Sequence, residues 1–240
     1  MSGHSHFATI KHKKGLADAQ RGNMFSKIAR EITVAAKEGG GDPAANPRLR
    51  TVIEKAHSFN MPSNNVERAV KKGLGAEEGG AALEEMLLEA YGPGGVAILI
   101  QGITDNKNRT LGEIKQILAK YQGKMVEGGA VQWLFERKGV MKATTGEKTK
   151  DELELLSIEA GAQDTAWPEE NVLEIYTAPA ELDLVKKKLE EKGVKVESAG
   201  LEWVAKEPAV ITQNTQETLE KLFAELDEND AVQDVYSNIK

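Results

Sequence analysis

The stretch of sequence that decides the fold is residues 86–103, MLLEAYGPGGVAILIQGI. Two apolar runs rich in β-forming residues, 86–91 and 96–103, flank the tetrapeptide Gly-Pro-Gly-Gly. A loop built only of turn-forming residues between two such runs predicts a β-hairpin. Further strands are expected at 131–135 and 139–143, separated by a turn, and at 172–177, 194–205 with a break at Gly200, and 231–237.

Amphipathic helices are predicted between these strands. Leucine, isoleucine and valine recur with spacings of three and four residues, which places them on one helical face. The sets are Leu111/Ile114/Leu118, Leu182/Val185/Leu189 and Leu219/Leu222/Leu226. Repeated strand–helix–strand units of this size predict two small α+β domains of ferredoxin-like type. Periodicity leaves open which strands pair across the middle of the chain.

The first 75 residues predict a different architecture, a three-helix unit preceded by an arm. Residues 1–15 have no helical or strand periodicity, whereas Phe25, Ile28, Ala29, Ile32 and Ala36 form one apolar stripe on a helix that ends at 39–41, Gly-Gly-Gly. A second helix is expected to begin at Asn46-Pro47, with an N-cap and a proline in the first turn. A third follows 61–62, Met-Pro, with Ser63 or Asn64 as its cap and Gly73 at its end.

Charge is distributed unevenly along the 240 residues, whose net charge is −7. Residues 1–75 contain 13 Lys or Arg and 6 Asp or Glu, a net charge of +7, so the remaining residues have a net charge of −14. All four histidines also lie in the basic segment. This contrast predicts a domain boundary near residue 75 and a polyanionic partner for the basic segment.

Phosphate binding is the natural use of the basic segment, because each Lys or Arg beside a phosphate releases counterions. The candidate residues of the arm and first helix are Lys11, His12, Lys13, Lys14, Arg21, Lys27 and Arg30, and those of the third helix are Arg68, Lys71 and Lys72. Lys27, Arg30 and Lys37 are expected to project from one side of the first helix. The alternatives are a solvated face with a Lys27–Glu31 pair and, for the third helix, cations that offset the helix dipole.

Other chemistry has little support in the sequence. The loop 105–110 could bind an anion through Asn106, Lys107 and Arg109, as an enzyme that holds a phosphate would require, or could simply cap a helix. No cofactor or metal is expected, because the histidines at 4, 6 and 12 have no carboxylate nearby and the chain has no cysteine. No nucleophile lies beside a base, so we expect a protein without enzymatic activity.

The longest aliphatic run, 96–100, is too short for a membrane span, and the first residues have no apolar segment of a signal peptide. We therefore expect a cytoplasmic protein with no membrane contact.

Four motifs in order along the chain closely resemble the YebC family, which includes bacterial probable transcriptional regulators and a mitochondrial translational activator of cytochrome oxidase. They are GHSHFATIKHKKGLADAQRGNMFSKIAREI, YGPGG, TDNKNRT and GGAVQWLFERKG. Members often begin Gly-His-Ser-x-Trp, whereas this chain has Phe7 at the aromatic position.

The resemblance implies an α+β multidomain protein of three parts. They are a basic helical domain with its arm at 1–76, an α+β domain formed by 77–130 plus 206–240, and an α+β domain at 131–205 that is inserted between those two segments. It also implies a regulator that binds nucleic acid. DNA binding in transcriptional regulation is the leading hypothesis, and binding of ribosomal RNA as a translation factor is the alternative. The acidic domains could contact basic proteins such as those of the ribosome. The target sequence, the sign of regulation and the oligomeric state stay open.

Overall fold

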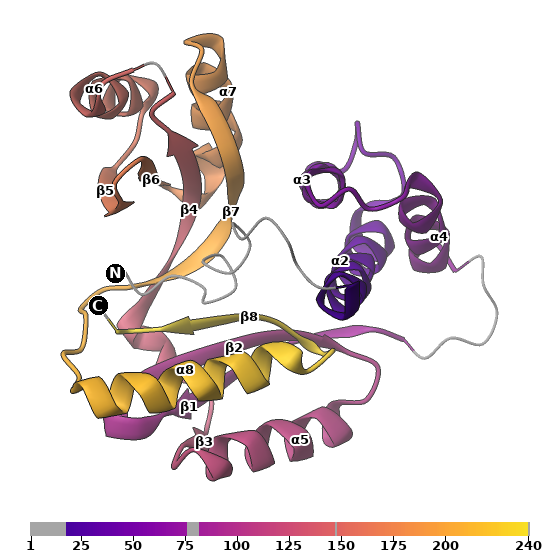
Figure 1. The fold of residues 1–240 in the computed structure, drawn as a ribbon. Coiled ribbons are helices and arrows are strands. Elements are labelled where there is room, and N and C mark those ends of the chain that lie inside the picture. The colour runs from indigo at the N-terminus through magenta and orange to yellow at the C-terminus, as the bar shows by residue number, and fades with distance from the viewer. Residues whose placement is uncertain (1–17, 76–81, 147, 240) are drawn as a thin grey trace. The chain divides into compact units, whose positions relative to one another are not determined.

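The computed structural model describes residues 18–75, 82–146 and 148–239 (Figure 1). They form two compact units. The larger unit contains the described residues up to Trp133 together with Ala209–Ser237, and the smaller contains Leu134–Pro208 with residues 238–239. Among the described residues, no helix is long and apolar enough to cross a bilayer.

Within residues 18–75 of the larger unit the structure has three helices at the predicted places. They are α2 (Asp18–Gly39), α3 (Pro47–Ser58) and α4 (Ser63–Gly73). Ile28 and Ile32 of the expected stripe on α2 are fully buried. They pack with Leu49 of α3 and Ala69 of α4 in one hydrophobic core. The core therefore anchors one side of each helix and leaves the other side for solvent or a partner.

Asn46 begins α3 in the predicted way and also joins two helices. Its side-chain oxygen accepts a hydrogen bond from the backbone N–H of Leu49 at 3.1 Å, and Pro47 occupies the first turn. Its amide nitrogen donates to the carbonyl oxygens of Ala35 at 2.8 Å and Gly40 at 2.9 Å. One buried side chain thus caps α3 and satisfies two carbonyl groups at the end of α2.

The start of α4 differs from the prediction. Neither Ser63 nor Asn64 is the N-cap, because Pro62 occupies that position with extended backbone and makes no side-chain capping bond. At the other end, Gly73 is the last residue of the helix and lies against α2. A Cβ atom at Gly73 would lie 2.3 Å from the carbonyl oxygen of Thr33. The glycine therefore permits a close helix contact.

The predicted hairpin is present in the sheet of the larger unit. The strands are β1 (Glu84–Tyr91), β2 (Ala97–Thr104), β3 (Lys124–Val126) and β8 (Val232–Ser237), all paired antiparallel in the order β3-β1-β2-β8. The turn η1 (Pro93–Gly95) joins β1 to β2. Gly94 and Gly95 there have φ of 70° and 76°, which glycine adopts without strain.

Two helices cover one face of this sheet, α5 (Lys107–Lys120) and α8 (Gln213–Glu228) (Figure 1). The hydroxyl of Thr110 on α5 lies 2.8 Å from that of Thr104 on β2. Ile98 of β2 and Leu219 of α8 both lie against Gly92. Because positions 98 and 104 of a strand point to the same side, α5 and α8 share that side.

The pairing of β8 with β2 joins two distant parts of the chain, with Ile100 opposite Val235. The resemblance to a known family implied this pairing. The division into 1–76, 77–130 plus 206–240, and 131–205 stays a prediction, because the structure groups the first two of these in one compact unit.

A buried carboxylate holds the segment that follows β3. Glu89 of β1 is 4% exposed and accepts hydrogen bonds from the backbone N–H groups of Gly129 at 2.5 Å, Val131 at 2.6 Å and Gln132 at 3.0 Å. Burial alone would raise the pKa of this carboxyl, but the three N–H groups together outweigh burial and the pKa lies below its ordinary value. Glu89 therefore stays ionised and fixes the segment.

The smaller unit has the strand–helix order expected of a ferredoxin-like domain. Its elements are β4 (Phe135–Thr144), α6 (Lys150–Ala160), β5 (Asp164–Glu169), β6 (Val172–Thr177), α7 (Leu182–Glu191) and β7 (Lys195–Ala205). The strands pair antiparallel in the order β5-β6-β4-β7. Met141, Leu153, Ile175 and Leu189 belong to the core between sheet and helices.

Two expectations for the strands were wrong. Residues 131–143 do not form two strands around a turn; a short 3-10 helix, η2 (Gln132–Leu134), precedes the continuous strand β4. Gly139 lies inside β4, where a Cβ atom would be 2.3 Å from the hydroxyl of Thr177. The strand β7 continues through Gly200, which pairs with Val140. The strands β3 and β5 were not predicted.

Candidate nucleic-acid interface

The exposed side of α4 presents three cations. Arg68, Lys71 and Lys72 are exposed, whereas Val66 and Ala69 on the other side of the helix are buried. Within the described part of the chain, none of the three forms an ion pair. The two lysines lie in the last turn, where they also offset the helix dipole. The dipole does not neutralise them. One exposed carboxylate of α4, that of Glu67, stands against these three cations, so the exposed side of the helix has a positive net charge.

Lys27 of α2 does not belong to such a face, contrary to the expectation that Lys27, Arg30 and Lys37 project together. The residue is 2% exposed. Its ammonium group donates to the backbone carbonyl of Asp227 at 2.5 Å and to a carboxylate oxygen of the same residue at 2.9 Å. A buried, paired ammonium is not available to a phosphate, and Lys27 therefore has a structural role.

The other cations of α2 lie in different surroundings. Arg30 is half-buried and donates from one guanidinium nitrogen to the carbonyl oxygen of Ile103 at 3.1 Å. A guanidinium group has five N–H donors, so Arg30 retains donors for a second acceptor. Arg21 and Lys37 are exposed.

Carboxylates within the basic segment neutralise two further cations. Lys55 pairs with Glu31 at 2.6 Å. The Lys27–Glu31 pair that the sequence offered as an alternative is therefore not formed. Arg48 pairs with Glu38 and with Glu85 of β1. The positive charge of the helical part is therefore concentrated on α4 and the adjoining side of α2.

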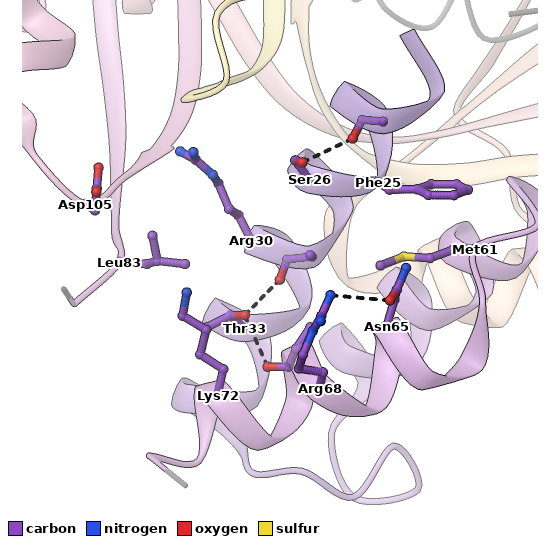
Figure 2. Close-up of a pocket in the computed structure, with 13 residues that line it drawn as sticks. Phe25, Ser26, Arg30, Thr33, Met61, Asn65, Arg68, Lys72, Leu83 and Asp105 are labelled. Carbon is purple, nitrogen blue, oxygen red and sulfur yellow. Dashed lines mark hydrogen bonds between the residues drawn. The ribbon is translucent and has the colours of Figure 1, made fainter. Parts of the chain in front are cut away.

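A pocket of about 580 Å³ lies between α2 and α4 (Figure 2). Arg30, Arg68 and Lys72 extend from the two helices around this hollow, and Phe25 and Met61 lie together at one side of it (Figure 2). We refer to this hollow as the α2–α4 pocket. It brings two of the predicted cations of α4 and one of α2 to a single concave site.

The helices that form the pocket are held at a fixed spacing. The hydroxyl of Thr33 on α2 lies 2.8 Å from the carbonyl oxygen of Ala29 and 3.1 Å from that of Ala69 on α4, and can donate to either (Figure 2). The close contact at Gly73 lies one turn away on α4. The walls of the pocket are therefore rigid relative to each other.

Sequence reasoning did not assign a role to Phe25 or Met61. Phe25 was placed in the apolar stripe and Met61 at a helix break, whereas both line the pocket. Phe25 is only half-buried, although it packs against the core. A large aromatic residue at the edge of an apolar stripe, one turn from a cation, is the signal that could have identified this site.

The loop 105–110 shows the geometry of a helix cap. The side chain of Asn106 accepts from the backbone N–H of Arg109 at 3.1 Å, and the guanidinium of Arg109 pairs with Asp105 at 2.5 Å. A second carboxylate, Glu113, lies 3.8 Å from Arg109. Lys107 is exposed. Since carboxylates already occupy the one guanidinium of the loop, its geometry favours capping over anion binding.

The predictions for the arm fall outside the described residues, as do three of the histidines. They concern Lys11, His12, Lys13 and Lys14, and the set His4, His6 and His12. Within the ranges that the structure describes, no three His, Asp or Glu side chains cluster in a way that could hold a metal ion.

Comparison with protein families gives two matches that together cover most of the chain. Residues 5–76 match the family described as the TACO1/YebC protein N-terminal domain, and residues 83–239 match the TACO1/YebC second and third domain. The first match contains α2, α3 and α4, and the second begins immediately before β1.

Relatives and a solved structure match over nearly the full length. A "Probable transcriptional regulatory protein" of Trichlorobacter lovleyi is 48% identical, over 99% of this chain and 95% of the relative. One with the same name from Persephonella marina is 47% identical, over 100% of this chain and 96% of the relative. The crystal structure of a conserved hypothetical protein from Aquifex aeolicus is 46% identical, with a TM-score of 0.89 over 98% of this chain and 97% of that one. The relatives' names support a regulatory role, and the chain belongs to the TACO1/YebC family.

Proposed function

We propose that this chain regulates gene expression without catalysing a reaction, by binding the phosphate backbone of a nucleic acid through the cations of α4 and the adjoining side of α2. The observation that supports this most is the exposed set Arg68, Lys71 and Lys72 on a helix whose opposite side is fixed in a hydrophobic core. The rigid helix already holds the backbone of these cations in place, so binding to a row of phosphates has to order only their side chains. Each contact also releases counterions from the nucleic acid.

Duplex DNA is the leading target, because the relatives are named as transcriptional regulatory proteins. An exposed basic helix next to a half-buried arginine can follow a DNA backbone, and phosphate contacts would position the protein without reading sequence. Nothing in the side chains of α4 predicts recognition of particular bases.

Ribosomal RNA is a second candidate, favoured by the distribution of charge. Residues 76–240 have a net charge of −14 and would be repelled by a long duplex lying along them. In a folded RNA assembly the same acidic surfaces can face basic proteins while α4 contacts phosphate.

The test is the dependence of affinity on salt. We expect the triple variant Arg68→Ala, Lys71→Ala, Lys72→Ala to bind a duplex DNA or a structured RNA more weakly than the unmodified protein. Affinity decreases with salt, so the slope of log affinity against log salt is negative. If all three residues contact phosphates, the variant's slope on duplex DNA is flatter by about 2.7, at about 0.9 for each contact. Fluorescence anisotropy of a labelled oligonucleotide over a salt series measures this slope.

A charge-matched control separates contact from net charge. Lys115→Ala, Lys187→Ala, Lys221→Ala removes the same charge from exposed positions on α5, α7 and α8, and we expect an unchanged slope. An unchanged slope in the α4 variant, or an equal change in the control, would contradict the proposal. Co-sedimentation of the protein with ribosomes at moderate salt, compared with its affinity for duplex DNA, decides between the two targets.

A further inference from the structure

The α2–α4 pocket contains more than a site for phosphate requires. A phosphate needs cations and N–H donors, whereas this pocket also has an aromatic ring and a thioether, contributed by Phe25 and Met61 (Figure 2). Phe25 is half-buried, so part of its ring is accessible from the hollow, whereas Met61 is only 5% exposed and belongs to the core against which Phe25 packs. Asn65, whose side chain has both a donor and an acceptor, also lines it.

These groups are arranged as a nucleotide requires. Arg68 and Lys72 extend from α4 and Arg30 from α2, while Phe25 and Met61 lie at another side of the same hollow (Figure 2). A nucleotide has a charged phosphate at one end and a flat, aromatic base at the other. Bases stack on aromatic side chains, and this interaction is tolerant of sequence because every base has a π-face.

The shape of the site favours an unpaired nucleotide over a base pair. A volume of about 580 Å³ lies within the range of pockets that bind small molecules. In a duplex the flat faces of the bases are covered by their neighbours, so a base reaches a concave site only when it is unpaired or flipped out. Duplex phosphates can contact the exposed rim on α4, but they leave the aromatic side of the pocket unused.

One carboxylate, that of Asp105, is found among the described residues that line the pocket. It pairs with the guanidinium of Arg109 at 2.5 Å, which offsets its charge. Three cations against one paired carboxylate leave the pocket positive, as an anionic ligand requires.

We infer that the α2–α4 pocket binds a single unpaired nucleotide of a nucleic acid, with the base against the ring of Phe25, which Met61 backs from the core, and the flanking phosphates against Arg68 and Lys72. This inference rests on the proposed function, the binding of nucleic acid by the cations of α4 and α2. It adds an unpaired nucleotide as the ligand of the pocket itself, whereas a continuous duplex would contact only the rim on α4. It makes a separate prediction: affinity depends on the presence of bases even when the number of phosphates is constant.

The experiment compares a single-stranded oligonucleotide with one of the same length in which several consecutive nucleotides lack their bases, each made as RNA and as DNA. The phosphates are equal in number, so a difference in affinity reports contact with bases. We expect the unmodified protein to bind the base-free strand about tenfold more weakly, which corresponds to stacking of about one base. The RNA and DNA arms show which backbone the pocket accepts.

A variant that fills the pocket without changing charge locates the effect. Ser26 lines the pocket, is exposed, and donates its hydroxyl to the carbonyl oxygen of Gly22 at 3.1 Å. Ser26→Leu places an aliphatic side chain at this wall. The matched control is Ser58→Leu on α3, because Ser58 is likewise exposed and donates to a carbonyl one turn earlier, that of Lys55 at 2.8 Å.

Ser26→Leu is expected to abolish the difference between the two strands, while Ser58→Leu keeps it. Equal affinity of the unmodified protein for the two strands would overturn the inference, as would a Ser26→Leu variant that still distinguishes them. If the unmodified protein binds the strands with and without bases equally, but the α4 triple variant has a flatter salt slope than the unmodified protein, only the pocket inference fails. If the slope of the triple variant also equals that of the unmodified protein, the proposed function fails as well.

Discussion

Replacing Glu89 by glutamine gives the sharpest test of how the larger unit is held together. The change keeps the shape of the side chain but removes its charge and one of its two acceptor oxygens. In the structure one carboxylate oxygen accepts from Gly129, and the other accepts from Val131 and Gln132. Glutamine can keep at most two of these three bonds, and its NH2 group then faces the remaining N–H donor.

The expected cost follows from those three contacts. A hydrogen bond to a charged group contributes about 1.5–3 kcal/mol and one between neutral groups about 0.5–1.5, so two retained bonds each weaken by about 1 kcal/mol. The donor that loses its partner in a buried site costs about 1–3 kcal/mol more. The free energy of unfolding of Glu89→Gln is therefore expected to fall by about 3 to 5 kcal/mol near neutral pH.

The effect also depends on pH in a defined direction. Because the pKa of Glu89 is lower in the folded than in the unfolded chain, its contribution is complete above the ordinary glutamate pKa and is lost as pH falls through the folded value. Urea unfolding of both proteins from about pH 7 to about pH 3 should therefore show the difference between them shrinking in acid. Amide hydrogen exchange of 127–134 should be faster in the variant near neutral pH.

A change in unfolding free energy below about 0.5 kcal/mol would refute the argument, since surface substitutions alone produce changes of that size. So would a difference that stays constant as the pH falls, because the charged form of Glu89 would then not be the stabilising species.

Two further substitutions test the roles assigned to buried polar residues. Lys27→Ala should lower the free energy of unfolding by about 2 to 3 kcal/mol, because it leaves the partly buried Asp227 unpaired. The same variant should leave the salt slope of nucleic-acid binding unchanged. A flatter slope would show instead that Lys27 contacts the nucleic acid. Asn46→Ala should lower the free energy of unfolding by about 2 to 3 kcal/mol, because it removes the cap of α3 and leaves two carbonyl groups unsatisfied. The control is Ser63→Ala, at a position that does not cap α4, which should change the free energy of unfolding by less than about 0.5 kcal/mol. Thermal or urea unfolding measures both.

Much of the fold could be predicted because local chemistry determines it. The turn at Gly94 and Gly95, the cap at Asn46 and the spacing of Ile28 and Ile32 each have a physical meaning within a few residues. Gly139 was wrongly predicted to follow a turn, because glycine occurs both in turns and inside strands where another residue approaches closely. The residues next to it in sequence do not show that Thr177 lies within contact distance. The short strand β3 was missed because three residues are too few for a pattern.

The candidate site was predictable only in part. Arg68, Lys71 and Lys72 could be assigned to an exposed face because the apolar spacing of α4 is unambiguous. Lys27 could not be assigned correctly, since its partner Asp227 is distant in sequence and only the folded chain brings them together. The pocket was hidden for the same reason: a concave site needs two helices, whereas periodicity describes one helix at a time.

The antiparallel pairing of β8 with β2 has a consequence for the order in which the protein folds during synthesis. Roughly 130 residues separate the two strands, so a ribosome adding about 5–20 residues per second exposes the outer edge of β2 for roughly 6 to 26 seconds before its partner is made. The strands β4 to β7 lie within that interval and form a complete sheet by themselves. The nascent chain can therefore finish its smaller unit while the larger one still has an open, aggregation-prone strand edge, and a chaperone that covers β2 would act in that interval.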